Sequence, residues 1–201
     1  MLDGPPAFDR HDSQDEPANQ LNWGTCASHA FACVVNKMLQ LKYHDVKLNT
    51  VKFTDWLISL SGGDAGSTAQ MLVETLNDTR SRSGERIKFE KADNPEVKYQ
   101  LQVVHFSVVE DFKQLLQLLE ADDTWCYISI KSGTGFHAVA GYSAVSTQGT
   151  AYARNSWGTR TPMHVTRENY AYHAIIQPGV IAAWSPQPES GGLQLVEVLF
   201  D

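Results

Sequence analysis

The stretch NQLNWGTCASHAF, residues 19–31, places a glutamine six positions before a cysteine, and Cys26 opens a run of small apolar residues. Apolar residues then recur at steps of three and four as far as Leu41. This spacing predicts a helix from Thr25, its N-cap, to about Lys42, with one face buried. The N-terminus of a helix carries a partial positive charge, so a thiol at this position is more readily ionised to the reactive thiolate. A buried structural cysteine needs neither this position nor an amide side chain upstream.

The composition of the 201-residue chain is that of a globular protein, with 42% hydrophobic and 19% charged residues. A net charge of -7 argues against nucleic acid as a partner. The three cysteines cannot all pair, so at least one thiol is free, which predicts the cytoplasm or another reducing compartment. The acidic N-terminus lacks the apolar core of a signal peptide. No apolar run approaches about 18 residues, so no membrane span is expected.

The first half of the chain reads as mostly helical. Further helices are predicted at about 51–60 and from the capping residue Ser67 to about 79, separated by the glycine-rich loop 61–66. Residues 80–95 are charged and loop-like. The sequon Asn77-Asp78-Thr79 is too short to carry weight as a glycosylation site.

The second half reads as mostly strand. Runs rich in β-branched and aromatic residues predict strands at 99–106, 125–131, 136–144, 150–154, 175–184 and 193–200, with the fifth broken at Pro178-Gly179. A capping-box spacing, Ser107 to Glu110, predicts one further helix. Its inward residues are Phe112, Leu115, Leu116 and Leu119. Helices followed by antiparallel strands indicate an α+β protein with two lobes, and a cleft between lobes is the natural place for a site.

Residues that could activate Cys26 lie in the strand-rich half. His137 stands at the mouth of an apolar strand, where it can form a thiolate–imidazolium pair and later protonate a leaving amine. Asn155 follows the strand that a hairpin would bring back beside His137, and its carbonyl can fix the imidazole tautomer. Trp157 can shield that hydrogen bond from water. The Gln20 side chain and the Cys26 N–H are candidate donors to an oxyanion.

Together these motifs resemble the papain-like cysteine peptidases. That family's signature is N-Q-x(5)-C at the start of the central helix, then H-A-V ahead of G-Y, then N-S-W-G. Here the corresponding segments are Asn19-Gln20 with Cys26, residues 137–139 with 141–142, and residues 155–158. Order and spacing agree over roughly residues 19 to 160, and three motifs in order are far more specific than one.

The resemblance implies a thiol peptidase that hydrolyses peptide or isopeptide bonds through an acyl-enzyme. It implies Cys26 as nucleophile, His137 as acid and base, Asn155 as orienting residue and Gln20 as oxyanion donor. Gly62, Gly63 or Gly66 would match the glycines that pair with substrate backbone, without a choice among them. No cofactor or metal is implied. The chain is expected to be a monomer that acts on a polypeptide substrate, and ubiquitin-like conjugates are further candidates.

The implied architecture is a single papain-like domain over residues 1–201. A helical lobe of roughly residues 20–98 would carry the nucleophile helix, and an antiparallel sheet or barrel of roughly residues 99–201 would form the other lobe with the N-terminal segment.

Several features depart from the family pattern. Ala27 stands where a tryptophan usually follows the nucleophile, and Trp23 stands where many members carry a disulfide-forming cysteine. Residues 159–162, TRTP, replace a glycine-rich motif. No pro-segment precedes the nucleophile motif, so either activity is controlled otherwise or the chain is excised from a longer one.

Other roles for the same residues stay open. His29, three residues after Cys26, could serve as the base, although nothing nearby is offered to orient it. Cys26, His29 and Cys33 share a helix face, but a zinc site there would need a fourth ligand. Gln20 could be an exposed loop residue and Asn155 a turn former.

The remaining candidates have structural interpretations. Cys33 and Cys126 are expected to be structural, and the other histidines to be surface or packing residues. Arginines between 80 and 86 are expected on a solvated face.

Two other functions compete with hydrolysis. The same thiol and histidine could pass an acyl group to an amine, which would make the chain an acyl transferase. The changes around Cys26 and after Gly158 also fit a catalytically dead peptidase fold that only binds.

Overall fold

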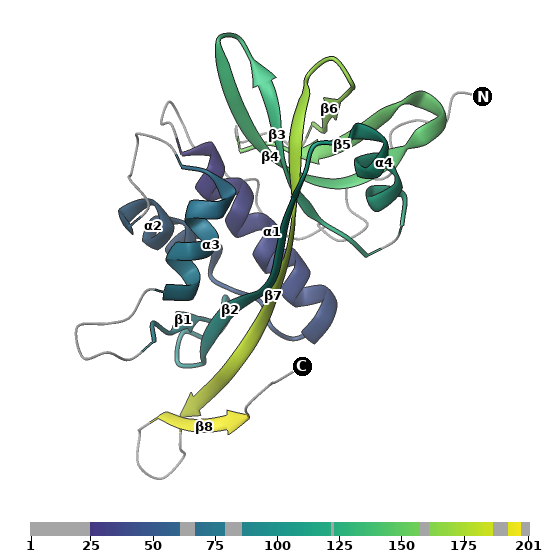
Figure 1. Cartoon of the computed structure of the whole chain (residues 1–201). Coiled ribbons are helices and arrows are strands. Elements are labelled where there is room, and N and C mark those ends of the chain that lie inside the picture. The colour runs from purple at the N-terminus through teal and green to yellow at the C-terminus, as the bar shows by residue number, and fades with distance from the viewer. Residues whose placement is uncertain are drawn as a thin grey trace.

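The computed structural model describes residues 25–60, 67–78, 86–121, 123–156 and 161–186, and the backbone of strand 193–197. Three helices come first and antiparallel strands follow, with a fourth helix between the second and third strands (Figure 1). This order confirms the predicted α+β class. None of the helices within the described ranges combines the length and apolarity needed to cross a bilayer.

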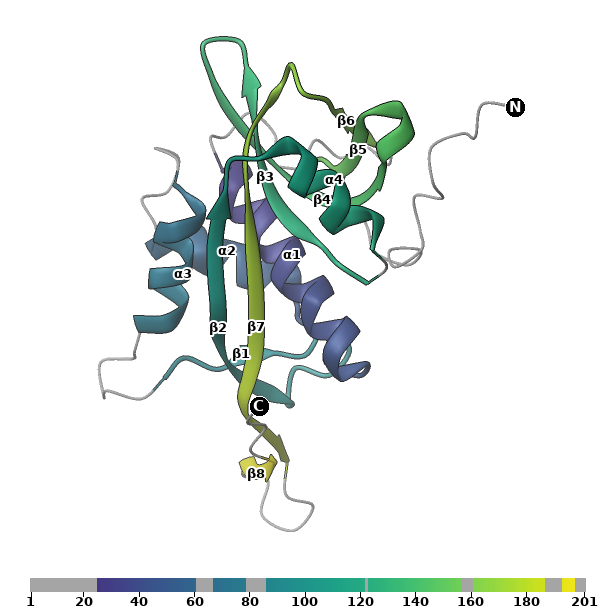
Figure 2. The ribbon, with the colours of Figure 1, turned by 45° about the vertical axis from the view of Figure 1, so that its right-hand side comes forward.

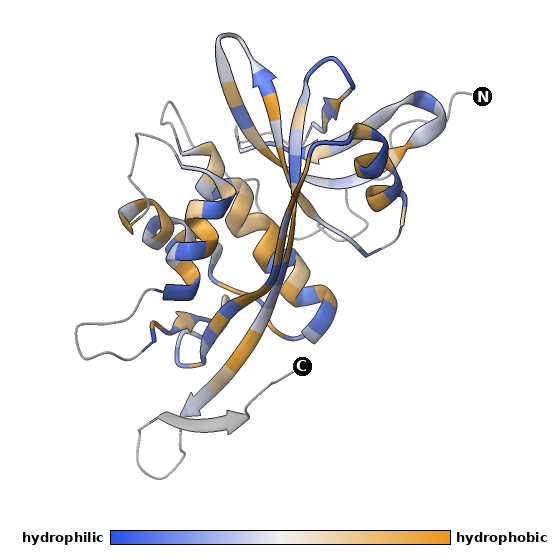
Figure 3. Ribbon diagram, viewed as in Figure 1, coloured by the Kyte–Doolittle hydropathy of each residue, from blue (hydrophilic) through white to orange (hydrophobic). Residues whose placement is uncertain are grey.

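The helical side is built around α1 (Cys26–Tyr43), with α2 (Thr50–Leu60) and α3 (Ala69–Asp78) packed against it. Apolar residues at helical spacing give α1 a continuous buried face that includes Ala27, Ala30, Phe31, Val34, Val35 and Leu39. The same helix contacts the fourth and seventh strands, so it lies between the other helices and the sheet (Figure 1). Apolar segments of α1 to α3 face this shared core (Figure 3).

The described residues form a sheet of eight strands: β1 (Phe89–Glu90), β2 (Lys98–Val109), β3 (Cys126–Ser132), β4 (Gly135–Val145), β5 (Thr150–Arg154), β6 (Met163–Val165), β7 (Tyr170–Pro186) and β8 (Leu193–Glu197). Their spatial order is β1-β2-β7-β3-β4-β5-β6, with β8 paired to β7, and every pairing is antiparallel. The long strands β2 and β7 run side by side along α1 to α3 and continue toward α4 (Figure 2).

Two hydrophobic clusters lie on this framework. The larger one joins α1, α2 and α3 to residues of β2, β3, β4 and β7, and the smaller one joins α4 (Phe112–Glu120) to β3, β4 and β5. The four predicted inward residues of α4, Phe112, Leu115, Leu116 and Leu119, are all buried. Leu101 of β2 and Val180 of β7 belong to the helix-side cluster. The predicted lobe boundary near residue 98 stays a prediction.

The predicted start of α4 was wrong. Ser107 belongs to β2, where it pairs with Ile175, and the capping-box spacing begins inside that strand, which ends at Val109. The helix begins after Asp111, whose carboxylate accepts a hydrogen bond from the Gln114 N–H at 3.1 Å. Pairing with β7 therefore decides the conformation here, because the ladder satisfies backbone groups that a local cap would satisfy only at one end.

The predicted break at Pro178-Gly179 was also wrong, since β7 is continuous through both residues. Pro178 lies opposite Val103, and the register then shifts so that Val104 is an extra residue in β2. The Val103 N–H and carbonyl bond instead to the side-chain amide of Asn77, at 2.8 and 3.3 Å. Proline is tolerated here because Val103 needs no N–H from the opposite strand.

Smaller differences concern helix starts and short strands. The third helix is capped by Thr68, whose hydroxyl accepts from the Met71 N–H at 3.2 Å, and not by Ser67. The short strands β1 and β6 were not predicted, because two or three residues carry too little periodicity to be recognised.

Candidate active site

Cys26 is the first residue of α1 and is partly buried. Thr25 occupies the N-cap position but makes no side-chain capping bond, so the predicted position is right and the predicted bond is missing. The first N–H groups of a helix have no partner within the helix, and they favour an anion beside them. The structure thus places the sulfur in a locally positive environment.

His137 is the third residue of β4 and is only 7% exposed. Its Nε2 lies 2.7 Å from Oδ1 of Asn155, which follows the end of β5 and is also buried. The same oxygen accepts a hydrogen bond from the Ser156 N–H at 2.8 Å, which identifies it as the carbonyl oxygen of the amide. Because that oxygen can only accept, Nε2 of His137 carries a proton, and Nδ1 is the nitrogen left for the thiol.

Cys26 and His137 shift each other's pKa toward the charged forms. Burial by itself disfavours the thiolate and would raise the pKa of Cys26. Three hydrogen bonds oppose this, from His137 and from the Ala138 and Ala27 N–H groups, and the charge of His137 adds to them. The net effect is a pKa of Cys26 below its ordinary 9.0. Burial alone would lower the pKa of His137, but hydrogen bonds with Cys26 and Asn155 and the thiolate charge raise it above 6.5. Both shifts favour a thiolate–imidazolium pair over two neutral groups.

Three separate segments meet at this point. α1 packs directly on β4, which places Cys26 beside residues 137–138. The β4–β5 hairpin pairs Ala140 with Arg154, and a register shift between Gly141 and Ser143 adjusts the ladder. The hydrogen bond between Asn155 and His137 follows from this register, in agreement with the predicted hairpin.

The other residues expected in the site fall outside the described ranges. These are Gln20, Trp157 and the three glycines Gly62, Gly63 and Gly66. Their assigned roles stay predictions.

The rival base, His29, has a different environment. Burial lowers its pKa, and nearby Asp55 of α2 opposes that shift only in part, so a neutral imidazole is favoured. Within the described ranges no group of three histidine, cysteine or acidic side chains could hold a metal ion. Cys126 is fully buried, and burial raises the pKa of its thiol, which suits a structural residue.

Two contacts of this site were not predicted from the sequence. The Ala138 N–H reaches the Cys26 sulfur, and the Asn155 side-chain NH₂ donates to the Met163 sulfur at 3.8 Å. A backbone donor leaves no trace in residue type. Met163 lies in β6, the strand that the sequence did not predict, just after the segment that departs from the family pattern.

The comparisons with known proteins give a likeness only at the level of structure. No family model matches the chain, and no curated protein matches it by sequence. Among solved structures, the Amb a 11 cysteine protease of ragweed pollen in its proform aligns with a TM-score of 0.56 and 14% identity over 81% of this chain. Bromelain from Ananas comosus, in complex with the E64 inhibitor, aligns with a TM-score of 0.56 and 12% identity, also over 81%.

The fold is papain-like. This confirms the predicted architecture of a helical side and an antiparallel sheet joined at the nucleophile helix. The present chain spans 61% of the length of the Amb a 11 proform and 93% of that of the bromelain chain. At such low identity the likeness concerns the fold alone, so the activity must be argued from this chain's own side chains.

Proposed function

We propose that this chain is a cysteine peptidase, which cleaves peptide or isopeptide bonds in polypeptides through an acyl-enzyme intermediate. The observation that carries the proposal is the hydrogen-bonded series from Cys26 through His137 to Asn155 at the start of α1. The pKa of the thiol is lowered and that of the imidazole is raised, which is the combination that nucleophilic attack followed by proton transfer requires.

In the acylation step, the Cys26 thiolate attacks the carbonyl carbon of the scissile bond and a carbon–sulfur bond forms. The carbonyl electron pair moves to oxygen, and the Cys26 N–H and the Gln20 side chain would stabilise that oxyanion. The oxyanion then collapses and the carbon–nitrogen bond breaks. The proton on Nδ1 of His137 passes to the leaving amine, which departs neutral and leaves a neutral imidazole.

In the deacylation step, neutral His137 accepts a proton from water as the water oxygen attacks the thioester. The carbon–sulfur bond breaks, which releases a carboxylic acid and restores the thiolate and the imidazolium. Through both steps Asn155 would hold the imidazole at Nε2, so that Nδ1 always faces the reacting atoms.

The finer parts of the proposal concern residues near the bound polypeptide. Gly62, Gly63 or Gly66 would let substrate backbone approach closely, since glycine has no side chain to obstruct it. Trp157 would keep water from the hydrogen bond between His137 and Asn155. Substrates include ordinary peptides and ubiquitin-like conjugates joined through lysine.

The test is cleavage of a panel of internally quenched peptides and lysine-linked ubiquitin conjugates by the wild type and by Cys26→Ala. We expect the wild type to cleave at least one substrate and the variant to cleave none, with its circular dichroism unchanged. Cys33→Ala, a second partly buried cysteine on the same helix, is the matched control and should retain cleavage. Wild-type turnover by purified Cys26→Ala would refute the proposal.

Two further measurements separate hydrolysis from its alternatives. Mass analysis of the products with an added amine would detect acyl transfer, because a transferase forms the amide in place of the acid. Iodoacetamide labelling at neutral pH would detect a dead site, because a thiol without activation stays largely unmodified.

A further inference from the structure

The side-chain amide of Asn155 has hydrogen-bond partners at both of its ends. Its oxygen lies 2.7 Å from Nε2 of His137 and accepts from the Ser156 N–H at 2.8 Å. Its NH₂ donates to the sulfur of Met163 at 3.8 Å. Asn155 is only 4% exposed, so its polar atoms depend on protein partners and not on bulk water. Among the described residues, the Met163 sulfur is the acceptor for the nitrogen end of this amide.

The sheet holds the Met163 sulfur in this place. Met163 is the first residue of β6 and pairs with Ala153 of β5, which lies two residues before Asn155. Ala153 is buried in the hydrophobic cluster under α4, and Met163 packs against the same cluster. Backbone pairing and packing thus bring the thioether to the end of β5. A thioether is a weak acceptor and has no hydrogen to donate, so it suits the NH₂ of the amide and not its oxygen.

A half-turn of the Asn155 amide would exchange its oxygen and its NH₂, and this would impair the candidate chemistry. The NH₂ would then face Nε2 of His137, so an imidazolium would have donor against donor. A neutral imidazole would carry its proton on Nδ1, where it could not accept a proton from water in deacylation. The Ser156 N–H and the Met163 sulfur oppose this half-turn from the two ends of the amide.

We propose that Met163 is a positioning residue, whose sulfur holds the Asn155 amide in the orientation that keeps a proton on Nε2 of His137. It acts through Asn155 and does not contact the reacting atoms. Because sulfur is a weak acceptor and Ser156 also restrains the amide, its removal should cost less than the removal of the Asn155 side chain. This inference rests on the proposed peptidase function.

The experiment compares wild type, Met163→Leu and Met163→Gln on the best internally quenched peptide. Leucine keeps an apolar side chain of similar size but offers no acceptor. We expect kcat to fall about three- to fivefold, the worth of one weak hydrogen bond, with KM little changed because both chemical steps need the same amide orientation. Glutamine offers a carbonyl oxygen at a similar reach, so Met163→Gln should recover most of the wild-type kcat.

A second readout reports on the imidazole itself. The hydrogen bond with Asn155 contributes to the raised pKa of His137. NMR titration should therefore give a lower pKa of His137 in Met163→Leu than in wild type, and a value close to wild type in Met163→Gln. A merely structural role of Met163 would not produce this pattern. Each variant is assayed well below its urea unfolding transition, so that a change in stability does not affect either readout.

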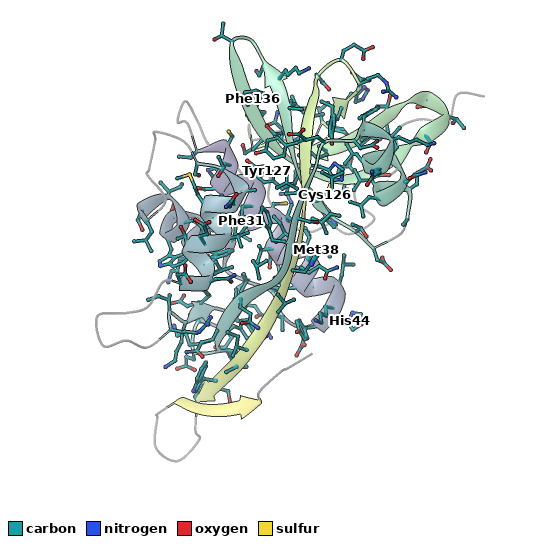
Figure 4. All side chains as sticks on the ribbon, viewed as in Figure 1. Phe31, Met38, His44, Cys126, Tyr127 and Phe136 are labelled. Atoms are coloured by element: carbon teal, nitrogen blue, oxygen red, sulfur yellow. The ribbon has the colours of Figure 1, made fainter. Side chains whose placement is uncertain are left out.

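The matched control is Met38→Leu. The Met38 sulfur also accepts a backbone hydrogen bond, from the Trp125 N–H at 3.3 Å. Met38 lies in the second half of α1, well away from Phe136, the residue next to His137 (Figure 4). This variant should keep the wild-type kcat and the wild-type pKa of His137.

Two results would overturn the inference while leaving the peptidase function intact. One is a Met163→Leu variant with the wild-type kcat and His137 pKa. The other is an equal loss in Met163→Leu and Met163→Gln, which would show that the shape of the side chain matters and not its acceptor. A wild type that cleaves no peptide and resists iodoacetamide would instead overturn the proposed function.

Discussion

His137 and His173 are two buried histidines of one sheet whose pKa values are shifted in opposite directions. His137 is 7% exposed and its Nε2 bonds to the Asn155 amide oxygen at 2.7 Å. His173 of β7 is 1% exposed and its Nδ1 lies 2.8 Å from the Tyr170 hydroxyl. Burial lowers the pKa of His173 to about 4, with Asp111 opposing only weakly, whereas the pKa of His137 is raised.

The difference between the two pKa shifts comes from the group that each histidine contacts at Nδ1. Tyr170 donates its own hydroxyl hydrogen to the Val109 carbonyl at 2.8 Å, so it can only accept from Nδ1–H of His173. That network is satisfied by a neutral imidazole, and an added charge would lack an anion in contact. At His137 the Cys26 thiolate supplies that anion. Equal burial thus yields a structural histidine in one place and a candidate acid in the other.

The largest effects on activity should come from removing His137 or Asn155 from the candidate site. His137→Ala removes the proton carrier and should lower kcat/KM about a thousandfold or more. Asn155→Ala should cost less, about ten- to a hundredfold, because packing still holds the buried ring. Steady-state cleavage of the best peptide measures both. His29→Ala should retain activity, and equal or reversed losses for the first two variants would contradict the assigned roles.

The next effect is acid destabilisation through His173. Between pH 6.5 and about 4 the unfolded state binds a proton at this ring and the folded state does not, so stability falls as the pH falls. The difference of two to three pKa units corresponds to about 3 kcal/mol of unfolding free energy. Urea unfolding across this pH range would measure it.

His173→Gln keeps a donor but cannot titrate, so its stability should depend less on pH. His105→Gln, at an exposed position of β2, should follow the wild-type curve. A pH dependence that is the same in wild type and His173→Gln would show that the acid sensitivity lies elsewhere.

A smaller loss should follow from Tyr170→Phe. The variant leaves the His173 N–H and the Val109 carbonyl without their partner, which should reduce the unfolding free energy by about 1–3 kcal/mol. Peptide cleavage below the unfolding transition should be unchanged, because the hydroxyl lies outside the candidate site. A large loss of activity with unchanged stability would contradict the division between the two histidines.

The final prediction needs no catalysis. Cys26→Ser replaces the thiolate by a neutral hydroxyl, so the pKa of His137 should fall, which would move it toward the behaviour of His173. Titration of the imidazole by NMR would measure the shift, with His173 as an internal reference. An unchanged pKa would show that Asn155, and not the thiolate, raises the pKa of His137.

Local pattern predicted most of the helices and strands well. The three- and four-residue spacing after Cys26 identified α1, and the spacing of Phe112, Leu115, Leu116 and Leu119 identified the inward face of α4. The errors at Ser107 and at Pro178 both arise from contacts between distant parts of the chain. At Ser107 pairing with β7 outweighs the local capping signal. At Pro178 the Asn77 side chain bonds to the backbone groups of Val103, so the proline is tolerated within the strand.

For the candidate site, residue types and their order were enough to single out Cys26, His137 and Asn155, because a thiol, an imidazole and an amide in such motifs suit one chemistry. Their meeting depends on the packing of α1 on β4 and on the β4–β5 register. The sequence by itself determined which groups are available and which segments are helical or extended, since those follow from side-chain chemistry and local periodicity. Only the tertiary structure decided which histidine has a raised pKa and which a lowered one, because pKa depends on burial and on neighbours brought together from distant parts of the chain.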